Sequence, residues 1–327
     1  MDTGRDDTEK NISIAVCSRD RHPQLEMLVE SLMSMKTSLL FEITVVEETD
    51  HPSPIPKVRY ISHPVANRGF PFARNLAIKN TDGRIVVFLD DDCRIENGWL
   101  DHLLSPFADD AVLGVQGGVT VPPQTNAIGW AESILGFPGG GIRRILMANG
   151  EIQETREIST LNCAYRRAVL EKIGGFAEFL IYGSEDYFLA KQVCSHGKCF
   201  FAPRALVYHD ARGNFSNIWR WFVRRGRAEM ALIKSQKLRE LNAIHVVKGS
   251  VFLKIIVFLF IAHLFPAYLP FLFFGAAFAY SCIQGPRYYG TWKGSKAPVS
   301  TLILLPLVKL TMDMAMDWGR LRGLLAR

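Results

Sequence analysis

The stretch IVVFLDDDCR (residues 85–94) sets five apolar residues directly before three consecutive aspartates. A short, unbroken apolar run rich in β-branched side chains predicts a strand buried on both faces, as in a parallel sheet. Capping of the helix expected from residue 97 would use one aspartate, not three. Like charges repel, so a positive partner is needed. A hard divalent cation, Mg²⁺ or Mn²⁺, prefers several carboxylate oxygens, and we favour that interpretation over capping for Asp90, Asp91 and Asp92.

The chain before residue 210 alternates short β-rich runs with helical patterns. Strands are expected at residues 12–18, 41–47, 57–62 and 84–90, with helices at residues 22–35 and 71–80 between them. This alternation predicts a mostly parallel α/β sheet flanked by helices. Ligands bind beyond the carboxyl ends of such strands. The polar residues at those ends are the aspartate triplet together with Ser18, Arg19, Glu47 and Glu48.

Composition and motifs narrow the class of protein. The 327 residues are 48 % hydrophobic and carry a formal net charge of +6, which favours an anionic partner such as a membrane surface or a phosphorylated ligand. The six cysteines form no Cys-x-x-Cys pair, so neither a zinc site nor a disulfide framework is indicated. A glycine-rich dinucleotide motif and a Walker lysine loop are both missing from the sequence. Residues 1–10 are polar and are expected to be flexible.

The sequence after residue 212 changes character. Residues 213–245 mix arginines with large aromatic residues, and we expect amphipathic helices at a membrane interface, with a solvated basic helix as the alternative. Residues 246–284 are almost entirely apolar and predict a transmembrane helical hairpin, with a buried hairpin of a soluble protein as the alternative. Basic residues on both sides predict cytoplasmic flanks, including a loop at 285–300. Residues 301–327 predict an amphipathic helix on the membrane surface.

Three motifs in order carry a resemblance to a known family. They are NRGFPFARNLAIKNTDGRIVVFLDDDCR (67–94), TLNCAYRRAVLEKIGGF (160–176) and YGSEDYFLAKQVCSHG (182–197). Together they resemble the Asn-x-Gly-x-x-x-Ala-Arg-Asn, Asp-x-Asp and Glu-Asp-x-x-Leu motifs of inverting family 2 glycosyltransferases. The resemblance implies a GT-A nucleotide-diphospho-sugar transferase fold over residues 11–212.

The resemblance also implies roles for individual residues. It assigns Ser18, Arg19, Glu47, Glu48, Asn67, Arg74, Asp90 and Asp91 to nucleotide-sugar binding, and Asp92 with Asp90 to the metal. The family more often has aspartate where Glu47 and Glu48 stand. His209 follows a β-rich run and is a candidate third ligand, although a lone histidine is more often structural.

The catalytic and acceptor residues follow in the same way. Asp186, next to Glu185 at the start of a helix, matches the general base, while its position alone fits helix capping equally well. Asn162 and Cys163 match the acceptor-side segment. Trp219, Arg220, Trp221 and Arg224 are the remaining acceptor-side candidates, and NIWRW (217–221) resembles the Gln-x-x-Arg-Trp of processive synthases with Asn217 in place of glutamine.

The function expected from these features is a membrane-attached, metal-dependent inverting glycosyltransferase at the cytoplasmic face of the cell membrane. Its partners would be a nucleotide-diphosphate sugar, a lipid-linked or glycan acceptor and membrane lipids, and no nucleic acid, since no nucleic-acid module accompanies the basic charge. Two alternatives stay open: a polyprenyl-phosphate glycosyl synthase, in which phosphate attacks without a base, and a non-catalytic nucleotide-sugar-binding membrane scaffold.

Overall fold

The computed structural model describes residues 11–238 and 243–326, so the expectation for residues 1–10 lies outside the described part. The chain divides into two compact units. The first contains the described residues up to Thr120, then Met147–Ile181 and Glu185–His209. The second contains Val121–Leu146, Tyr182–Ser184 and the described residues from Asp210 onward.

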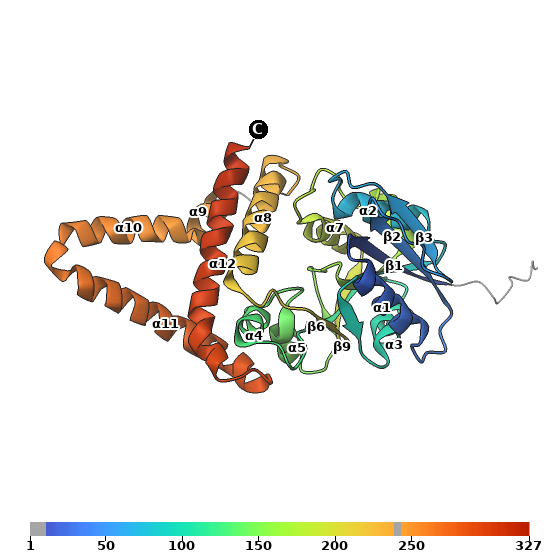
Figure 1. The fold of residues 1–327 in the computed structure, drawn as a ribbon, viewed down its shortest axis with the longest axis horizontal. Helices are drawn as coiled ribbons and strands as arrows, with labels where there is room; N and C mark the ends of the chain where they lie inside the picture. Colours follow the sequence, from blue (N-terminus) through green and yellow to red (C-terminus); the bar gives the residue numbers. More distant parts are fainter. Residues whose placement is uncertain (1–10, 239–242, 327) are drawn as a thin grey trace, which may run out of the picture. The chain divides into compact units, whose positions relative to one another are not determined.

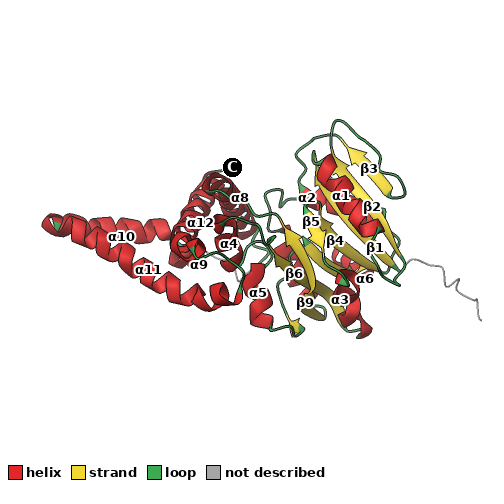
Figure 2. Cartoon of the chain, turned by 60° about the horizontal axis from the view of Figure 1, so that its bottom comes forward, coloured by secondary structure: helices red, strands yellow, loops and turns green. Residues whose placement is uncertain are grey.

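A nine-stranded sheet forms the centre of the first unit, in the order β3-β2-β1-β4-β8-β6-β9-β5, with β7 also paired to β9 (Figure 1, Figure 2). The strands are β1 (Ile12–Arg19), β2 (Phe41–Glu48), β3 (Arg59–His63), β4 (Ile85–Asp90), β5 (Cys93–Ile95), β6 (Val112–Thr120), β7 (Gln153–Glu154), β8 (Asn162–Arg166) and β9 (Lys198–His209). The four strands predicted from sequence, β1 to β4, are all parallel. The sheet as a whole is mixed, because β8 runs antiparallel to both of its neighbours.

Helices cover both faces of this sheet, as the apolar strands require. They are α1 (His22–Met33), α2 (Phe70–Lys79), α3 (Trp99–Leu104) with the 3₁₀ turn η1 (Ser105–Ala108), α6 (Arg167–Ile173) and α7 (Glu185–Cys194). Successive strand residues point to opposite faces. Ile14 and Val16 therefore join the core that includes α1 and α3, while Ala15 and Cys17 join the core that includes α2, α6 and α7.

The second unit is helical. It contains α4 (Ala127–Ile134), the start of α5 (Gly141–Ala148), α8 (Phe215–Lys234), α9 (Ala243–Gly249), α10 (Val251–Leu264), the 3₁₀ turn η2 (Pro266–Tyr268), α11 (Leu269–Gly294) and α12 (Ser300–Leu325). Helix α12 lies along α8 (Figure 1). Their backbones approach closely at Gly226 and Gly319, where a Cβ atom would overlap a carbonyl oxygen of the other helix.

Helix α8 confirms a helix in the basic aromatic segment but not the expected use of its aromatic residues. Phe222 is buried, and Trp219 and Trp221 are partly buried against the same apolar cluster, which also includes Leu305 and Val308 of α12. Trp221 additionally stacks under the guanidinium of Arg212, 3.9 Å from its ring centroid. Phe222 is therefore a core residue of the second unit, both tryptophans pack against that core, and a place for this segment at a membrane interface stays a prediction.

The apolar segment 246–284 does contain two helices, α10 and α11, joined at η2. Across the described ranges we find no helix that combines the length and the apolar content of a membrane span. The transmembrane part of the prediction is not supported: α10 has 14 residues, about 21 Å at 1.5 Å per residue. Helix α11 also continues to Gly294, so most of the predicted loop 285–300 is helical.

The C-terminal helix forms as α12, with one difference from the expected pattern. The amphipathic pattern predicts that the charged residues of this helix lie on its polar, exposed face. Asp317, however, is only 5 % exposed. Its carboxylate pairs with Arg320 at 2.9 Å, and Arg320 in turn pairs with Glu229 of α8 at 2.7 Å. The ion pairs of Arg320 with Asp317 and Glu229 thus join α12 to α8, because the paired charges neutralise one another where the two helices meet.

Candidate functional site

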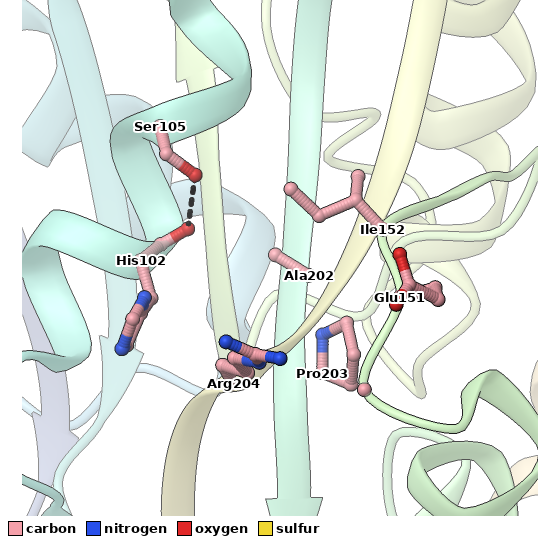
Figure 3. Close-up of a pocket in the computed structure, with 8 residues that line it drawn as sticks. His102, Ser105, Glu151, Ile152, Ala202, Pro203 and Arg204 are labelled. Atoms are coloured by element: carbon pink, nitrogen blue, oxygen red, sulfur yellow. Dashed lines mark hydrogen bonds between the residues drawn. The ribbon is translucent and has the colours of Figure 1, made fainter.

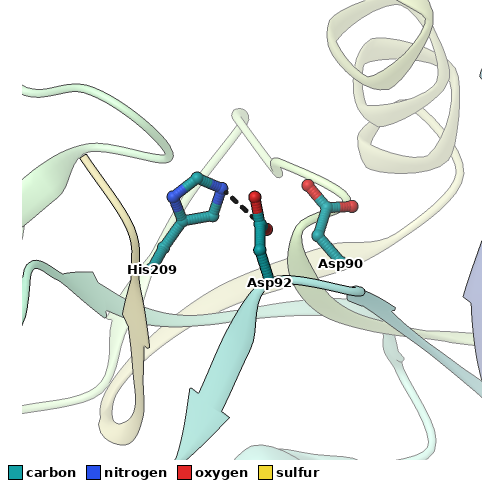
Figure 4. A group of neighbouring side chains, drawn as sticks. All are labelled: Asp90, Asp92 and His209. Carbon is teal, nitrogen blue, oxygen red and sulfur yellow. Dashed lines mark ion pairs between the residues drawn. The ribbon is translucent and has the colours of Figure 1, made fainter. Parts of the chain in front are cut away.

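Three potential metal ligands lie together at one edge of the sheet. Asp90 ends β4, Asp92 lies in the turn before β5, and His209 ends β9 (Figure 4). The register pairs Cys93 of β5 with His209, which brings the imidazole beside Asp92, with Nε2 3.2 Å from Oδ1. One ligand atom from each of the three residues lies within 4.8 Å of the other two. Two carboxylates and an imidazole suit Mn²⁺ or Mg²⁺, so the residues fit the expected ion.

Asp91 turns away from this group and forms a buried contact with β1. Its Oδ2 accepts a hydrogen bond from Ser18 Oγ at 2.6 Å. The pKa of Asp91 is raised to about 6, chiefly by burial and also by the neighbouring Asp92 and Asp90, against the lowering effect of Ser18 and Arg21. Ser18 is only 2 % exposed, so its hydroxyl serves Asp91 rather than a ligand in this arrangement.

Arg21 is a site residue that the sequence analysis missed. Its Nη1 donates to Asp91 Oδ1 at 3.2 Å and to Asp92 Oδ2 at 2.9 Å. The guanidinium therefore supplies part of the positive charge that three adjacent aspartates require. Its position just after the first strand, two residues from Arg19, was the available signal, since all carboxyl ends of the parallel strands meet at this edge.

Arg74 and Glu185 form a buried ion pair beside the metal ligands. Arg74 also lies 3.6 Å from Asp90. Burial alone would lower the pKa of Arg74, but the carboxylates of Glu185 and Asp90 raise it. Burial raises the pKa of Glu185, and Arg74 opposes that shift. Both side chains are less than 10 % exposed, so Arg74 holds Glu185 and Asp90 in place instead of reaching outward to a nucleotide.

The second oxygen of Glu185, Oε2, is buried and has no hydrogen-bond partner among the residues that the structure describes. An unpaired buried acceptor of this kind is costly. It is available to accept a hydrogen bond from a ligand that enters the site.

Asp186 lies in the first turn of α7 and is partly exposed. Its Oδ1 accepts the N–H of Tyr187 at 2.7 Å. The chain enters the helix through two residues with positive φ, Gly183 (125°) and Ser184 (66°), a conformation that is strained for serine. Burial raises the pKa of Asp90, and repulsion from Asp92 and Asp186 raises it further, so Asp186 belongs to the same group of charges.

Glu47 and Glu48 point to opposite faces of the sheet, as successive strand residues must. Glu47 is 1 % exposed; its Oε2 accepts from Tyr60 at 2.5 Å and contacts His22 at 3.1 Å. Both neighbours enclose the Glu47 side chain in this structure, and its assignment to nucleotide-sugar binding stays a prediction.

Glu48 organises the loop that follows β3. Its Oε1 accepts the backbone N–H groups of Ala66 and Asn67, each at 3.0 Å, and its Oε2 lies 3.6 Å from Arg19. Arg19 also donates to the side chain of Asn67 at 2.8 Å. Asn67 has φ of 51°. Of these residues predicted to bind the donor, Arg19 and Asn67 are exposed at this edge. Glu48 is buried and accepts backbone N–H groups of the loop.

The predicted acceptor-side residues fall into two groups. Asn162 and Cys163, on β8, are both 0 % exposed. The amide of Asn162 accepts from Trp99 Nε1 and donates to the carbonyls of Gly118 and Ala205. Both side chains are enclosed in this structure, and their acceptor-side assignment stays a prediction. The second group, Trp219, Arg220, Trp221 and Arg224, lies on α8 in the second unit.

A separate cavity of about 330 Å³ lies in the first unit between α3, β9 and the segment 150–152 (Figure 3). His102 and Arg204 are among its lining residues, and Ser105 Oγ donates to the carbonyl of His102 at 3.1 Å. It arises where β9 shifts register against β6, between Gly117 and Gly118. Its lining residues include none of the predicted site residues.

Comparison with known proteins identifies the domain. Residues 13–174 match the family model described as glycosyl transferase family 2. The succinoglycan biosynthesis protein ExoM of Rhizobium meliloti is 26 % identical over 66 % of this chain and 71 % of its own length. The pre-mycofactocin glycosyltransferase of Mycobacterium tuberculosis is 24 % identical over 67 % of this chain, and AglE of Haloferax volcanii 26 % identical over 53 %. The match spans about half the length of these last two relatives.

Solved structures share the fold at low sequence identity. The mannosyltransferase PcManGT from Pyrobaculum calidifontis, solved with GDP-Man and Mn²⁺, aligns with a TM-score of 0.56 and 17 % identity, over 96 % of this chain and 87 % of its own. GalNAc-T7, solved with UDP, GalNAc and Mn²⁺, aligns with a TM-score of 0.50 and 14 % identity, over 71 % of this chain and 52 % of its own. Residues 13–174 are therefore a glycosyl transferase family 2 domain, carried on an α/β fold of the GT-A type.

Proposed function

We propose that this chain is a metal-dependent, inverting glycosyltransferase that moves a sugar from a nucleotide-diphosphate sugar to a hydroxyl acceptor. The observation that carries this function is the group formed by Asp90, Asp92 and His209, whose two aspartates lie at the end of β4 within the family 2 match and whose histidine ends β9. Similar folds were solved with nucleotide sugars or their components and Mn²⁺. A Mg²⁺ or Mn²⁺ ion held by these three residues would supply Lewis-acid stabilisation of the departing diphosphate.

Asp186 is the candidate general base of this reaction. It is partly exposed, whereas its neighbour Glu185 is buried against Arg74. Only a carboxylate that reaches the acceptor hydroxyl can remove its proton, so Asp186 is the better candidate of the two. Attack by one activated hydroxyl inverts the anomeric carbon, and no carboxylate nucleophile is needed. Glu185 then acts as a positioning residue for Arg74 and Asp90.

We further propose that the enzyme works at the cytoplasmic face of the cell membrane on a lipid-linked or growing-glycan acceptor. The basic residues on both sides of the apolar hairpin support this location, because basic flanks favour the cytoplasmic side. Relatives named for succinoglycan biosynthesis and for glycosyl transfer support a role in glycan synthesis.

The test is a transfer assay with the full chain, Mn²⁺ and a panel of UDP-, GDP- and dTDP-sugars, in which the anomeric configuration of the product is read by NMR. We expect inversion with at least one donor and loss of turnover in Asp92→Asn and Asp186→Asn. The matched control is Asp110→Asn, whose carboxylate is fully exposed. Full activity in Asp92→Asn, or no transfer and no donor hydrolysis with any sugar, would contradict the function. Activity retained by Asp186→Asn alone would favour a phosphate acceptor.

A further inference from the structure

Helices α10 and α11 expose an apolar surface that extends well beyond isolated side chains. Among the described side chains of these two helices, seven large aliphatic or phenylalanine residues are each more than 60 % exposed: Ile256, Phe260, Phe271, Phe273, Phe274, Phe278 and Ile283. Soluble monomers rarely expose contiguous apolar patches beyond a few hundred Å². The hairpin extends away from the paired helices α8 and α12 of its own unit (Figure 1, Figure 2). This surface needs an apolar environment.

The exposed residues surround each helix rather than marking one stripe. On α10, five of the six positions from Ile256 to Ile261 are exposed, and consecutive helix positions differ by about 100° in direction. On α11, the adjacent residues Phe273 and Phe274 are both exposed. A protein partner covers one face of a helix, as an amphipathic stripe would indicate. Lipid acyl chains cover every face at once.

The turn between the two helices has few unpaired backbone donors, which matters in hydrocarbon because no water can satisfy them. Phe265 donates its N–H to the carbonyl of Ala262 at 3.2 Å, and Tyr268 donates to Phe265 at 3.0 Å. Pro266 and Pro270 have no N–H to satisfy. The tip is therefore suited to an environment without water.

The charges flanking the hairpin complement an anionic lipid surface. Residues 241–312 contain no aspartate or glutamate and six basic residues: Lys248, Lys254, Arg287, Lys293, Lys296 and Lys309. Lys248 precedes α10, while Arg287 and Lys293 lie in the second half of α11, so basic charge gathers at the base of the hairpin and not at its tip. Tyr289 and Trp292 stack at 5.6 Å near the same end, and such side chains favour the headgroup region.

The base of the hairpin is fixed to the rest of its unit by one buried carboxylate. Asp317 Oδ2 accepts hydrogen bonds from Ser250 Oγ, Val251 N and Phe252 N, at 3.0, 2.6 and 2.9 Å. Asp317 thus caps the start of α10 from helix α12. This contact fixes where the hairpin leaves the unit, and with it the end that faces the headgroups.

We infer that α10 and α11 form a monotopic membrane anchor, which enters the bilayer from one side and returns to the same side without crossing it. Helix α10 is about 21 Å long, whereas the hydrocarbon core of a bilayer is about 30 Å thick and one leaflet about half of that. The tip then ends inside the bilayer, and both flanking segments stay on one face. The anchor does not depend on the transfer reaction, so either could fail alone.

The first test is flotation of the full chain with vesicles of phosphatidylcholine, alone or with about a third phosphatidylglycerol. We expect the wild type to float, and more so with phosphatidylglycerol at low salt. Phe271→Asp/Phe274→Asp replaces two exposed side chains and should lower binding about tenfold or more. Met27→Asp, at a residue 63 % exposed on α1, is the matched control and should float normally. A wild-type chain that stays unbound, or a double variant that floats, would overturn the inference.

A second test distinguishes a hairpin that returns to the same side of the bilayer from one that spans it, and from a hairpin covered by a second copy of the chain. In a Cys282→Ser background, Tyr268→Cys carrying an environment-sensitive fluorophore should report an apolar site, quenched by brominated acyl chains. Labelling of the same cysteine by a maleimide trapped inside the vesicles would show a span instead. Light scattering without vesicles tests whether a second copy of the chain covers the hairpin instead. A wild type that forms a stable dimer and does not float, together with a Phe271→Asp/Phe274→Asp variant that is monomeric, would show that it does.

Discussion

Arg21 Nη1 lies 2.9 Å from Asp92 Oδ2, so a side chain of the protein itself touches a carboxylate that we assign to the metal. The same nitrogen contacts Asp91 at 3.2 Å. The positive charge required by the aspartate triplet is therefore shared between a guanidinium and the expected cation. Since Arg21 is about half exposed, its pairing can exchange when a ligand arrives.

Replacing Arg21 should change metal affinity in the opposite direction to replacing a ligand. Arg21→Met removes a positive charge beside Asp92, and we expect Mn²⁺ alone to bind roughly two- to fivefold more tightly, the size of a half-exposed ion pair. Titration calorimetry with Mn²⁺ measures this. Arg94→Met, at an exposed arginine of β5, is the control. Weaker Mn²⁺ binding in Arg21→Met would show that Arg21 supports the site in another way.

Removing one partner of the Arg74–Glu185 ion pair should lower the free energy of unfolding much more than replacing both partners with apolar residues. Arg74→Met leaves the buried Glu185 and the partly exposed Asp90 without their partner, and we expect a loss of about 3–5 kcal/mol in the free energy of unfolding. Arg74→Met/Glu185→Leu removes both charges and should recover most of that stability. Urea unfolding followed by circular dichroism gives both values. If the double variant also recovers turnover, the pair has no role in positioning Asp90.

Asn162 is predicted to be structural. Asn162→Ala leaves the Trp99 indole N–H and two carbonyls without partners in the core, which should destabilise the first unit by about 2–4 kcal/mol. The control is Gln24→Ala on the exposed side of α1, for which no loss is expected. Thermal unfolding is compared with turnover per folded molecule. Unchanged stability together with a raised KM for the acceptor would show instead that Asn162 contributes to acceptor binding.

Two glycines in helices should respond in opposite ways to the same substitution. Gly319→Ala places a Cβ against the carbonyl oxygen of Val223, so we expect a loss of about 2 kcal/mol or more as α8 and α12 separate. Gly290→Ala in α11 places its Cβ more than 4 Å from every described atom outside its own stretch of helix and should be neutral or stabilising by up to about 1 kcal/mol, because alanine favours helix. Chemical unfolding of the two variants is the measurement, and equal effects would contradict the close packing of α8 and α12.

Local patterns predicted the first half of the sheet well. The expected strand at residues 12–18 is β1 (Ile12–Arg19), and that at residues 84–90 is β4 (Ile85–Asp90). Each is an apolar run that signals burial on both faces from its own composition. The antiparallel insertion of β8 between β4 and β6 had no such local sign, because pairing direction depends on how the chain returns to the sheet.

At the candidate site, too, the sequence predicted local features but not the contacts between distant residues. The sequence placed aspartates at a strand end, where ligands bind. It did not reveal that Arg21 would reach them, or that Asn162 and Glu47 would be enclosed, because these contacts join residues far apart in the chain. Arg74 stands in a motif that the sequence shows, yet its partner Glu185 became known only from the ion pair that joins α2 to α7.

The order of apolar and acidic residues, by itself, determined a buried parallel half-sheet with a charged edge and an apolar segment near the C-terminus, since periodicity and composition act over neighbouring residues. Tertiary structure alone decided that His209 meets Asp92, that Phe222 of α8 is internal, and that the described residues leave the phenylalanines of α11 exposed. Strand register and helix packing set those contacts, and both depend on the free energy of the whole assembled chain rather than on any one segment.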